Sequence, residues 1–256
     1  MRVVVKVGTS TLAHKTGKLN IKHANALCRV LSDLKNAGHE VILVSSGAIG
    51  MGVGKLGLKE RPVDIPTKQA AAAVGQCELM YVYDRAFGEY GHTVAQILLT
   101  GSDFSAADRH ENFTNTMTRL LSLGALPIIN ENDTIATEEI KVGDNDTLSA
   151  LVAVSVQADV LVILSDVDGL YSADPHKNED AKLIERVHGI PEWVFALGGG
   201  EGSALGTGGM KTKISAAKIC LEKGCDTVIA NGEKPELLYD IVDGKLNGYT
   251  RFFAEE

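Results

Sequence analysis

Apolar residues occur along this chain in short continuous runs, which alternate with longer stretches of helical periodicity. The runs predict strands that are buried on both faces of a sheet, because such strands show little polar alternation. They cover residues 2–7, 40–44, 93–99, 126–130, 159–164 and 226–230. Apolar positions spaced three and four residues apart predict helices over residues 21–34, 67–90, 111–123, 146–157, 211–223 and 235–242.

This alternation of strands and helices predicts an α/β fold, a three-layer αβα sandwich with a mostly parallel central sheet. The length of 256 residues allows one large α/β domain or two small ones, and the sequence shows no internal repeat and no low-complexity linker. In a sheet of this kind, ligands bind at the carboxyl ends of the strands, where loops lead into helices. The segments that follow the predicted strands are therefore where chemistry is expected.

Composition narrows the class of protein. The formal net charge is -8 at pH 7, which argues against a nucleic acid or an anionic membrane as partner. Lys6 interrupts the apolar N-terminus too early for a signal peptide, and no apolar run reaches the roughly 20 residues of a membrane span. The cysteines form no CxxC pair and are expected as buried or half-buried thiols of a cytoplasmic protein; they are Cys28, Cys77, Cys220 and Cys225.

The first two strands lead into segments that could bind an anion. KVGTS, at residues 6–10, combines a lysine, a glycine and hydroxyl groups at a strand end. SSGAIG, at residues 45–50, opens a helix with small residues, as an anion site at a helix N-terminus does. Taken alone, each has a structural alternative: a surface lysine before a turn, and a helix cap with tight packing against the sheet.

Polar residues are concentrated in two further segments, NENDT at residues 130–134 and GDNDT at residues 143–147. Their acceptors would suit an ammonium group, and the amide donors of Asn145 would suit a carboxylate. Calcium is the obvious rival, but the remainder of an EF-hand loop is absent. A capping turn rich in Asn and Asp is the structural alternative for this stretch.

The last pair of segments comprises SDVDG at residues 165–169 and GTGGMKTK at residues 206–213. Lys211 and Lys213 fall in the first turn of a predicted helix, where a positive charge opposes the helix dipole. Binding to the phosphates of a nucleotide would explain these lysines better than helix stability does, and a solvated linker is the alternative. The GxGxxG string at residues 52–57 does not directly follow a strand, so a dinucleotide site is not expected there.

Taken together, these segments resemble the glutamate 5-kinase family, a branch of the wider amino-acid-kinase family. The resemblance spans essentially the whole chain and rests on KVGTS, SSGAIG, INENDTIAT, EIKVGDNDTLSA, SDVDGLYSADP and GTGGMKTK, in this order. The segments INEND and KVGDND are the most specific to glutamate 5-kinases. Many bacterial members carry a C-terminal PUA domain, and the sequence resembles either the short form that lacks it or the kinase domain of a longer protein.

The resemblance implies an ATP-dependent enzyme that phosphorylates the side-chain carboxylate of L-glutamate, the first step of proline biosynthesis. It implies one domain over residues 1–256, with an acceptor-substrate lobe over about 1–164 and a nucleotide lobe over about 165–256. The implied catalytic residues are Lys6, Lys213 and Asp146, and the implied glutamate-binding residues are Ser46, Gly47, Asp133 and Asn145. The implied nucleotide contacts are Lys6, Gly8, Thr9, Ser165, Asp166, Thr207, Gly208, Gly209, Met210, Lys211, Thr212 and Lys213.

Further expectations follow from the same resemblance. Mg²⁺ would accompany ATP, held mainly by the nucleotide and water, and no protein ligand is assigned to it. Proline as a feedback inhibitor, hand-over of the product to a glutamyl phosphate reductase, and a homo-oligomer are implied by analogy. The alternatives are another enzyme of the wider family, such as a UMP or carbamate kinase, and a non-catalytic sensor of amino acids or nucleotides. The sequence does not separate the roles of Asp144, Asn145 and Asp146.

Overall fold

The computed structural model describes residues 1–14, 18–136, 144–175, 177–198 and 209–254. These residues form a sheet of eight strands in the order β3-β4-β2-β1-β5-β7-β8-β6. The strands are β1 (Arg2–Val7), β2 (Glu40–Ser45), β3 (Val94–Leu99), β4 (Leu126–Glu131), β5 (Val160–Ser165), β6 (Arg186–His188), β7 (Asp226–Asn231) and β8 (Thr250–Phe253). All neighbouring strands pair in parallel except β7 and β8, which are antiparallel.

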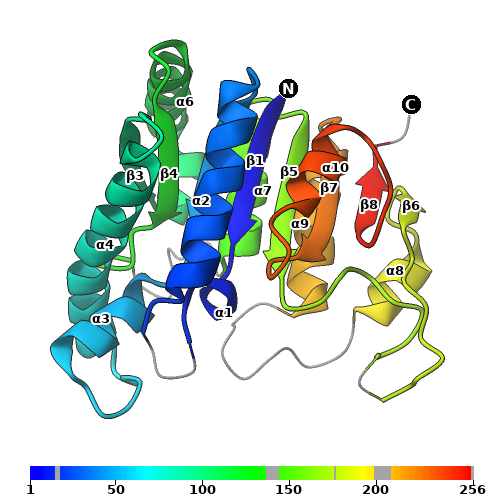
Figure 1. Cartoon of the computed structure of the whole chain (residues 1–256), viewed down its shortest axis with the longest axis horizontal. Helices are drawn as coiled ribbons and strands as arrows, with labels where there is room; N and C mark the ends of the chain where they lie inside the picture. The colour runs from blue at the N-terminus through cyan, green and yellow to red at the C-terminus, as the bar shows by residue number, and fades with distance from the viewer. Residues whose placement is uncertain (15–17, 137–143, 176, 199–208, 255–256) are drawn as a thin grey trace.

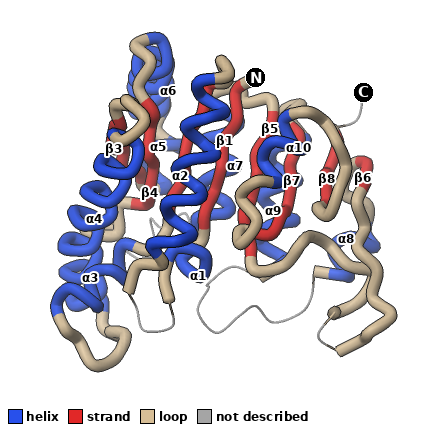
Figure 2. The backbone as a smooth tube through the Cα atoms, in the orientation of Figure 1, coloured by secondary structure: helices blue, strands red, loops and turns tan. Residues whose placement is uncertain are grey.

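Helices cover both faces of this sheet (Figure 1). They are α1 (Thr9–Leu12), α2 (Ile21–Asn36), α3 (Ala48–Leu56), α4 (Ile65–Gly88), α5 (Gly101–Ser105), α6 (Ala107–Ser122), α7 (Asn145–Ser155), α8 (Glu192–Leu197), α9 (Met210–Leu221) and α10 (Leu237–Val242). Figure 2 shows α2, α4 and α10 in front of the strands, with α6, α7 and α9 behind them. The predicted three-layer α/β fold with a mostly parallel sheet is confirmed.

Alternation along the strands divides the core between the two faces. On β1, Val3, Val5 and Val7 pack in one apolar cluster with α2, α4 and α10, while Val4 packs in a second cluster with α6, α7 and α9. Successive side chains of a strand point to opposite faces, so Lys6 lies on the same face as Val4. The sequence of β1 therefore directs Lys6 toward the helices α7 and α9.

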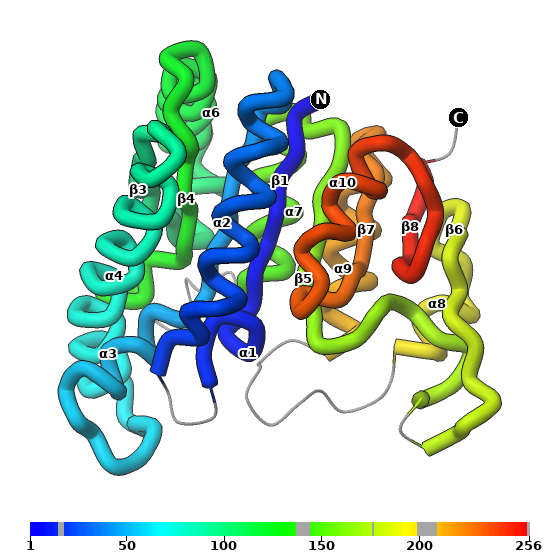
Figure 3. Tube along the Cα trace, in the orientation of Figure 1, coloured from blue at the N-terminus to red at the C-terminus, as the bar shows by residue number. Residues whose placement is uncertain are grey.

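The carboxyl ends of the parallel strands lie at the lower edge of the molecule in Figure 3, where α1 and α3 also lie. Gly47 caps the N-terminus of α3 with φ of 106°, a left-handed conformation that favours glycine. Further along α3, a Cβ on Gly52 would lie 1.8 Å from the backbone oxygen of Ala71 in α4. Gly52, the first glycine of the GxGxxG string, thus serves a close contact between two helices.

The structure corrects the prediction for one of the four cysteines. Cys77 is exposed, contrary to the prediction of buried or half-buried thiols, whereas Cys28, Cys220 and Cys225 are buried; none of the four forms a disulfide. Burial raises the pKa of the Cys28 thiol to about 12. In the part of the chain that the structure describes, no helix has both the length and the apolar character to cross a membrane.

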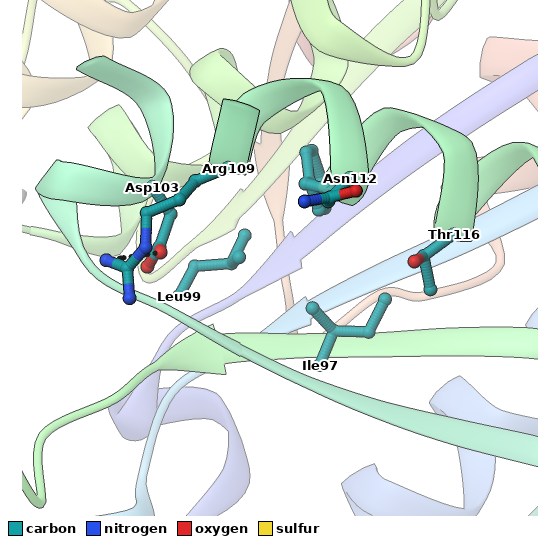
Figure 4. A pocket seen from close by; sticks show the side chains of 7 residues that line it. Ile97, Leu99, Asp103, Arg109, Asn112 and Thr116 are labelled. Atoms are coloured by element: carbon teal, nitrogen blue, oxygen red, sulfur yellow. Dashed lines mark ion pairs between the residues drawn. The ribbon is translucent and has the colours of Figure 1, made fainter. Parts of the chain in front are cut away.

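A hollow of about 270 Å³ lies at the outer edge of the sheet, between β3 and the helices α5 and α6 (Figure 4). An ion pair of 3.0 Å between Arg109 and Asp103 borders this hollow, and Leu99 and Phe113 supply apolar walls. It lies beside β3, an outermost strand of the sheet, which is separated from the central strand β1 by β4 and β2. Leu99 also accepts a backbone hydrogen bond of 2.7 Å from Asn132, so the hollow borders the predicted segment that follows β4.

Candidate active site

Three charged side chains from distant parts of the sequence meet at the carboxyl end of β1. The Lys6 ammonium lies 2.7 Å from Asp146 Oδ1, and the Lys213 ammonium lies 3.2 Å from Asp146 Oδ2. Asp146 belongs to the first turn of α7 and Lys213 to the first turn of α9, and both helices cover the face to which Lys6 points. The structure thus brings together the three residues predicted to be catalytic.

These charges are buried. The exposed fractions of the side chains are 10% for Lys6, 1% for Asp146 and 7% for Lys213. Burial by itself raises the pKa of the Asp146 carboxyl, but the two ammonium groups and the Thr212 hydroxyl outweigh burial and hold this pKa below its ordinary value. Two cations against one anion leave this group of residues with a net positive charge, which suits an anionic ligand.

Three consecutive residues at the start of α7 contact three different sets of partners. Asp144 is the N-cap, and its carboxylate accepts a hydrogen bond of 2.8 Å from the backbone N–H of Thr147. Asn145 reaches the ends of β2 and β4, whereas Asp146 turns toward the two lysines. Successive side chains of a helix point about 100° apart, so adjacent residues here serve separate neighbours.

Asn145 connects two predicted segments by hydrogen bonds from its amide group. Its Nδ2 donates to Ser46 Oγ at 2.7 Å and to Asn130 Oδ1 at 3.1 Å. Asn130 Nδ2 in turn donates to Gln76 Oε1 at 3.0 Å. The amide donors of Asn145, which sequence reasoning had reserved for a carboxylate ligand, are therefore engaged within the protein.

The loops after β1 and β2 lie against each other. The backbone N–H of Ser46 donates to the Val7 carbonyl at 3.1 Å, and a Cβ on Gly47 would lie 4.0 Å from Thr9 Cγ2. Gly8 has φ of -84°, which any residue can adopt, so its backbone does not require glycine. A Cβ at Gly8 would lie 3.6 Å from Lys6 Nζ, and a longer side chain would cover this ammonium.

The N-terminus of α9 supplies further predicted residues. Gly209 is the N-cap and offers no side-chain cap, Met210 is half-buried and Lys211 is exposed. Thr212 donates to Asp146 Oδ2 at 2.8 Å, so it supports the carboxylate that the lysines share. The predicted contacts Thr207 and Gly208 lie outside the described residues.

A second polar group lies at the ends of β5 and β7. Ser165 Oγ donates to Asp166 Oδ1 at 3.1 Å, and the Ser165 carbonyl accepts from the backbone of Gly232. Asp168, which was not predicted as a site residue, accepts hydrogen bonds from Asn231 at 3.0 Å and Lys234 at 3.2 Å. Burial by itself raises the pKa of the Asp168 carboxyl, but the hydrogen bonds from Asn231, Tyr171 and Lys234 outweigh burial and hold this pKa below its ordinary value.

The turn after β4 holds one more predicted residue, and two further residues of this site were not predicted. Asp133 is half-buried in the turn after β4. Gln76 and Asn130 were not singled out, although Asn130 stands in the INEND segment; Gln76 is in mid-helix, where no local pattern marks it. Among the described residues, no group of His, Cys, Asp or Glu side chains gathers as ligands of a metal ion would.

Comparison with known proteins identifies the family. The family model described as "Amino acid kinase family" matches residues 1–231. The chain belongs to the amino acid kinase family. Similar relatives within this family are bacterial proteins named glutamate 5-kinase. The one from Clostridium tetani is 55% identical over 96% of this chain and 92% of its own length.

Two further relatives of the same name show how far the likeness extends. The glutamate 5-kinase of Clostridium perfringens is 51% identical over 100% of this amino acid kinase chain and 96% of its own length. That of Caldanaerobacter subterraneus subsp. tengcongensis is 54% identical over 98% of this chain and 67% of its own length. The matched relatives thus include proteins of similar length and longer ones.

Solved structures of other amino acid kinases share the fold. The UMP kinase of Ureaplasma parvum has a TM-score of 0.68 and 16% identity, with 98% of each chain covered. The carbamate kinase of Giardia lamblia bound to AMP-PNP also has a TM-score of 0.68 and 16% identity, and covers 99% of this chain and 98% of its own. At such identities the likeness shows the fold alone.

Proposed function

We propose that this amino acid kinase is a glutamate 5-kinase, which transfers the γ-phosphoryl group of ATP to the side-chain carboxylate of L-glutamate. The observation that carries the proposal is the identity of 51–55% to proteins of that name over nearly the whole chain. The group formed by Lys6, Asp146 and Lys213 supports it, because a kinase of this family needs positive charge at the transferring phosphoryl. The reaction is the first step of proline biosynthesis.

The chemistry requires no general base. The γ-carboxylate of glutamate is ionised at pH 7, so one of its oxygens attacks the γ-phosphorus directly. A bond forms between this oxygen and phosphorus, and the bond to the β–γ bridging oxygen breaks, so that ADP leaves with the electron pair. No proton is transferred in this step, and the products are γ-glutamyl phosphate and ADP.

The residues of the chain contribute position and charge. Lys6 and Lys213 stabilise the negative charge that spreads over the phosphoryl oxygens during transfer. Asp146 holds the two ammonium groups at a fixed separation by binding one with each carboxylate oxygen. Gly8, which carries no side chain that would cover the Lys6 ammonium, and the uncapped N-terminus of α9 fit phosphate oxygens, which backbone N–H groups bind well.

The remaining parts of the proposal assign the two substrates to two lobes. Ser46, Gly47, Asp133 and Asn145 bind glutamate in the lobe over about 1–164. The nucleotide lobe over about 165–256 contributes Ser165, Asp166 and residues 207–213, while Gly8 and Thr9 approach the phosphates from β1. Mg²⁺ supplies further neutralisation of the phosphates, held by nucleotide and water.

The wider biological assignments rest on the resemblance. They include self-association, feedback inhibition by proline and hand-over of the unstable acyl phosphate to a reductase. A cytoplasmic location agrees with the four unpaired cysteines, since thiols stay reduced there. Carbamate and UMP kinases are the alternatives within the family. Their structures share only 16% identity with this chain, whereas the glutamate 5-kinases share more than half of the aligned residues.

The test is ADP release from MgATP with and without L-glutamate, with hydroxylamine present to trap acyl phosphate as hydroxamate. Glutamate-dependent hydroxamate in an amount equal to ADP is the expected result. UMP and carbamate, offered separately as acceptors, should not increase ADP release. ADP release that depends on UMP or carbamate but not on glutamate would overturn the proposal.

A further inference from the structure

A chain of buried amide groups runs from the middle of α4 to the start of α7. Gln76 Oε1 accepts a hydrogen bond from Asn130, and Asn130 Oδ1 accepts one from Asn145, at 3.0 and 3.1 Å. Only 7% of Gln76 and 2% of Asn130 are exposed. Buried amides of this kind are held in one orientation only if each has suitable partners.

Two backbone groups fix the direction of this chain. The backbone N–H of Glu131, which can only donate, lies 2.9 Å from the Asn130 side chain, so the atom that it contacts is Oδ1. Asn130 must then offer its Nδ2 to Gln76, and Gln76 must offer Oε1 in return. At the other end, the Ser45 carbonyl can only accept, and it lies 3.5 Å from Asn145 Nδ2, which favours the same orientation of Asn145.

This direction decides what Asn145 can offer to a ligand. Its Nδ2 is engaged with Asn130 and Ser46, whereas its Oδ1 is buried without a hydrogen-bond partner in the described part of the chain. A buried acceptor without a partner destabilises the protein until a donor reaches it. An ammonium group is such a donor, and it is also the group that distinguishes glutamate from a plain dicarboxylate.

The backbone that carries Gln76 is tightly packed, although Gln76 Nε2 is buried without a hydrogen-bond partner in the part of the chain that the structure describes. Its neighbour Gly75 packs against the start of α3, where a Cβ would lie 1.7 Å from the Ala48 carbonyl oxygen. Ala48 follows Ser46 and Gly47 directly, so the backbone beside Gln76 touches the segment that carries a predicted glutamate contact. A rigid helix backbone positions a side chain better than a loop does.

We propose that Gln76 is a positioning residue of the acceptor site. Its Oε1 accepts from Asn130 Nδ2 and, together with the backbone N–H of Glu131, stabilises the amide orientation of Asn130 and through it that of Asn145, so that Asn145 Oδ1 faces the α-ammonium group of the amino acid. This inference rests on the proposed function. It adds to that function a residue that selects amino acids over dicarboxylates that lack an amine.

The test replaces Gln76 by methionine, which has a similar volume and cannot accept the hydrogen bond from Asn130. Loss of one such bond predicts a rise of about tenfold in KM for L-glutamate, with KM for ATP unchanged. Glutarate, which has both carboxylates and no ammonium group, should inhibit the variant and the unaltered protein with equal Ki. Gln76→Glu keeps an acceptor at the same place and should restore most of the affinity for glutamate.

A matched control lies on the same helix. Tyr83→Phe also removes one buried hydrogen bond, the 2.7 Å contact between the Tyr83 hydroxyl and Ser45 Oγ, but this bond is outside the amide chain. It should lower stability without the tenfold change in KM. If Gln76→Met is too unstable to assay, Gln76→Asn breaks the same contact, because its side chain is shorter by one methylene.

The outcomes separate this inference from the proposed function. An unchanged KM for glutamate in Gln76→Met would overturn the positioning role. Equal weakening of glutamate, glutarate and ATP would overturn it as well, since it would show only a general loss of structure. Failure of the unaltered protein to form glutamate-dependent hydroxamate would instead reject the proposed function.

Discussion

Replacing Asp146 by asparagine removes the carboxylate that Lys6 and Lys213 share, and it changes the size of the side chain little. At an effective dielectric constant of about 20, the attraction across 2.7 Å is about 6 kcal/mol and across 3.2 Å about 5 kcal/mol. The cost of burying the carboxylate offsets a large part of this attraction. Removing one partner of a buried ion pair lowers the free energy of unfolding by about 3–5 kcal/mol, and this is the loss expected for Asp146→Asn.

The assay is urea unfolding at neutral pH, followed by circular dichroism, with thermal unfolding as a second measurement. For a domain of this size the expected loss corresponds to a decrease in Tm of about 6–20 °C. Asp243→Asn is the matched control, because the Asp243–Lys245 ion pair has the same length of 2.7 Å but exposed fractions of 57% and 62%. Its loss should change the free energy of unfolding by less than about 1 kcal/mol.

The comparison tests whether burial gives the interaction its strength. An Asp146→Asn variant within about 1 kcal/mol of the unaltered protein would refute the reasoning. So would equal losses in Asp146→Asn and Asp243→Asn, because distance alone would then determine both. A large loss confined to Asp146→Asn would support a carboxylate held between two ammonium groups away from water.

Other predictions follow from the same geometry. Lys213→Ala should lower kcat at least about a hundredfold with little change in KM for glutamate. The control Lys218→Ala, at an exposed position of the same helix, should change neither value. An unchanged kcat in Lys213→Ala would show that Lys213 does not stabilise the transition state. Gly75→Ala should cost more than about 2 kcal/mol in urea unfolding, because its Cβ would lie 1.7 Å from a backbone oxygen of α3, whereas Gly88→Ala meets nothing within 4 Å and should be neutral or stabilising. Because the pKa of Asp146 is lowered in the folded protein, the stability that its carboxylate contributes is fully present above about pH 4, the ordinary pKa of an aspartate, and is lost as the pH falls through the lower folded pKa. Asp146→Asn should therefore flatten the acid side of a profile of stability against pH, measured by urea unfolding.

The sequence predicts the centre of the sheet well and its far edge poorly. β1 and β5 consist largely of branched apolar residues, which is typical of strands covered on both faces. β6 reads Arg-Val-His and buries only Val187, so it has no pattern to distinguish it from a loop. It is a strand because β8 pairs with it, and β8 in turn depends on β7. Such strands are defined by tertiary pairing rather than by local composition.

The candidate site, too, could be predicted from the sequence only in part. The resemblance implied that Lys6, Lys213 and Asp146 act together, and the structure places Asp146 in contact with both lysines. Local sequence could not show that adjacent residues at the start of α7 point to different partners. Nor could it indicate Gln76, whose importance arises from contacts with residues far away in the chain. Helical periodicity marks such a residue only as one that faces the interior.

The placement of charges is the strongest physical argument that this end of the sheet binds an anion. Lys211 and Lys213 stand in the first turn of α9, where the helix dipole disfavours positive charge, and no acidic residue accompanies them in that turn. Lys6 and Lys213 are both buried, although lysine is rarely buried unless it is paired, and they share one carboxylate. Replacing buried ion pairs by apolar residues often stabilises a protein, so stability alone does not explain this group. A ligand with several negative charges would compensate the excess positive charge and the unfavourable helix terminus together, and the phosphates of ATP have this property.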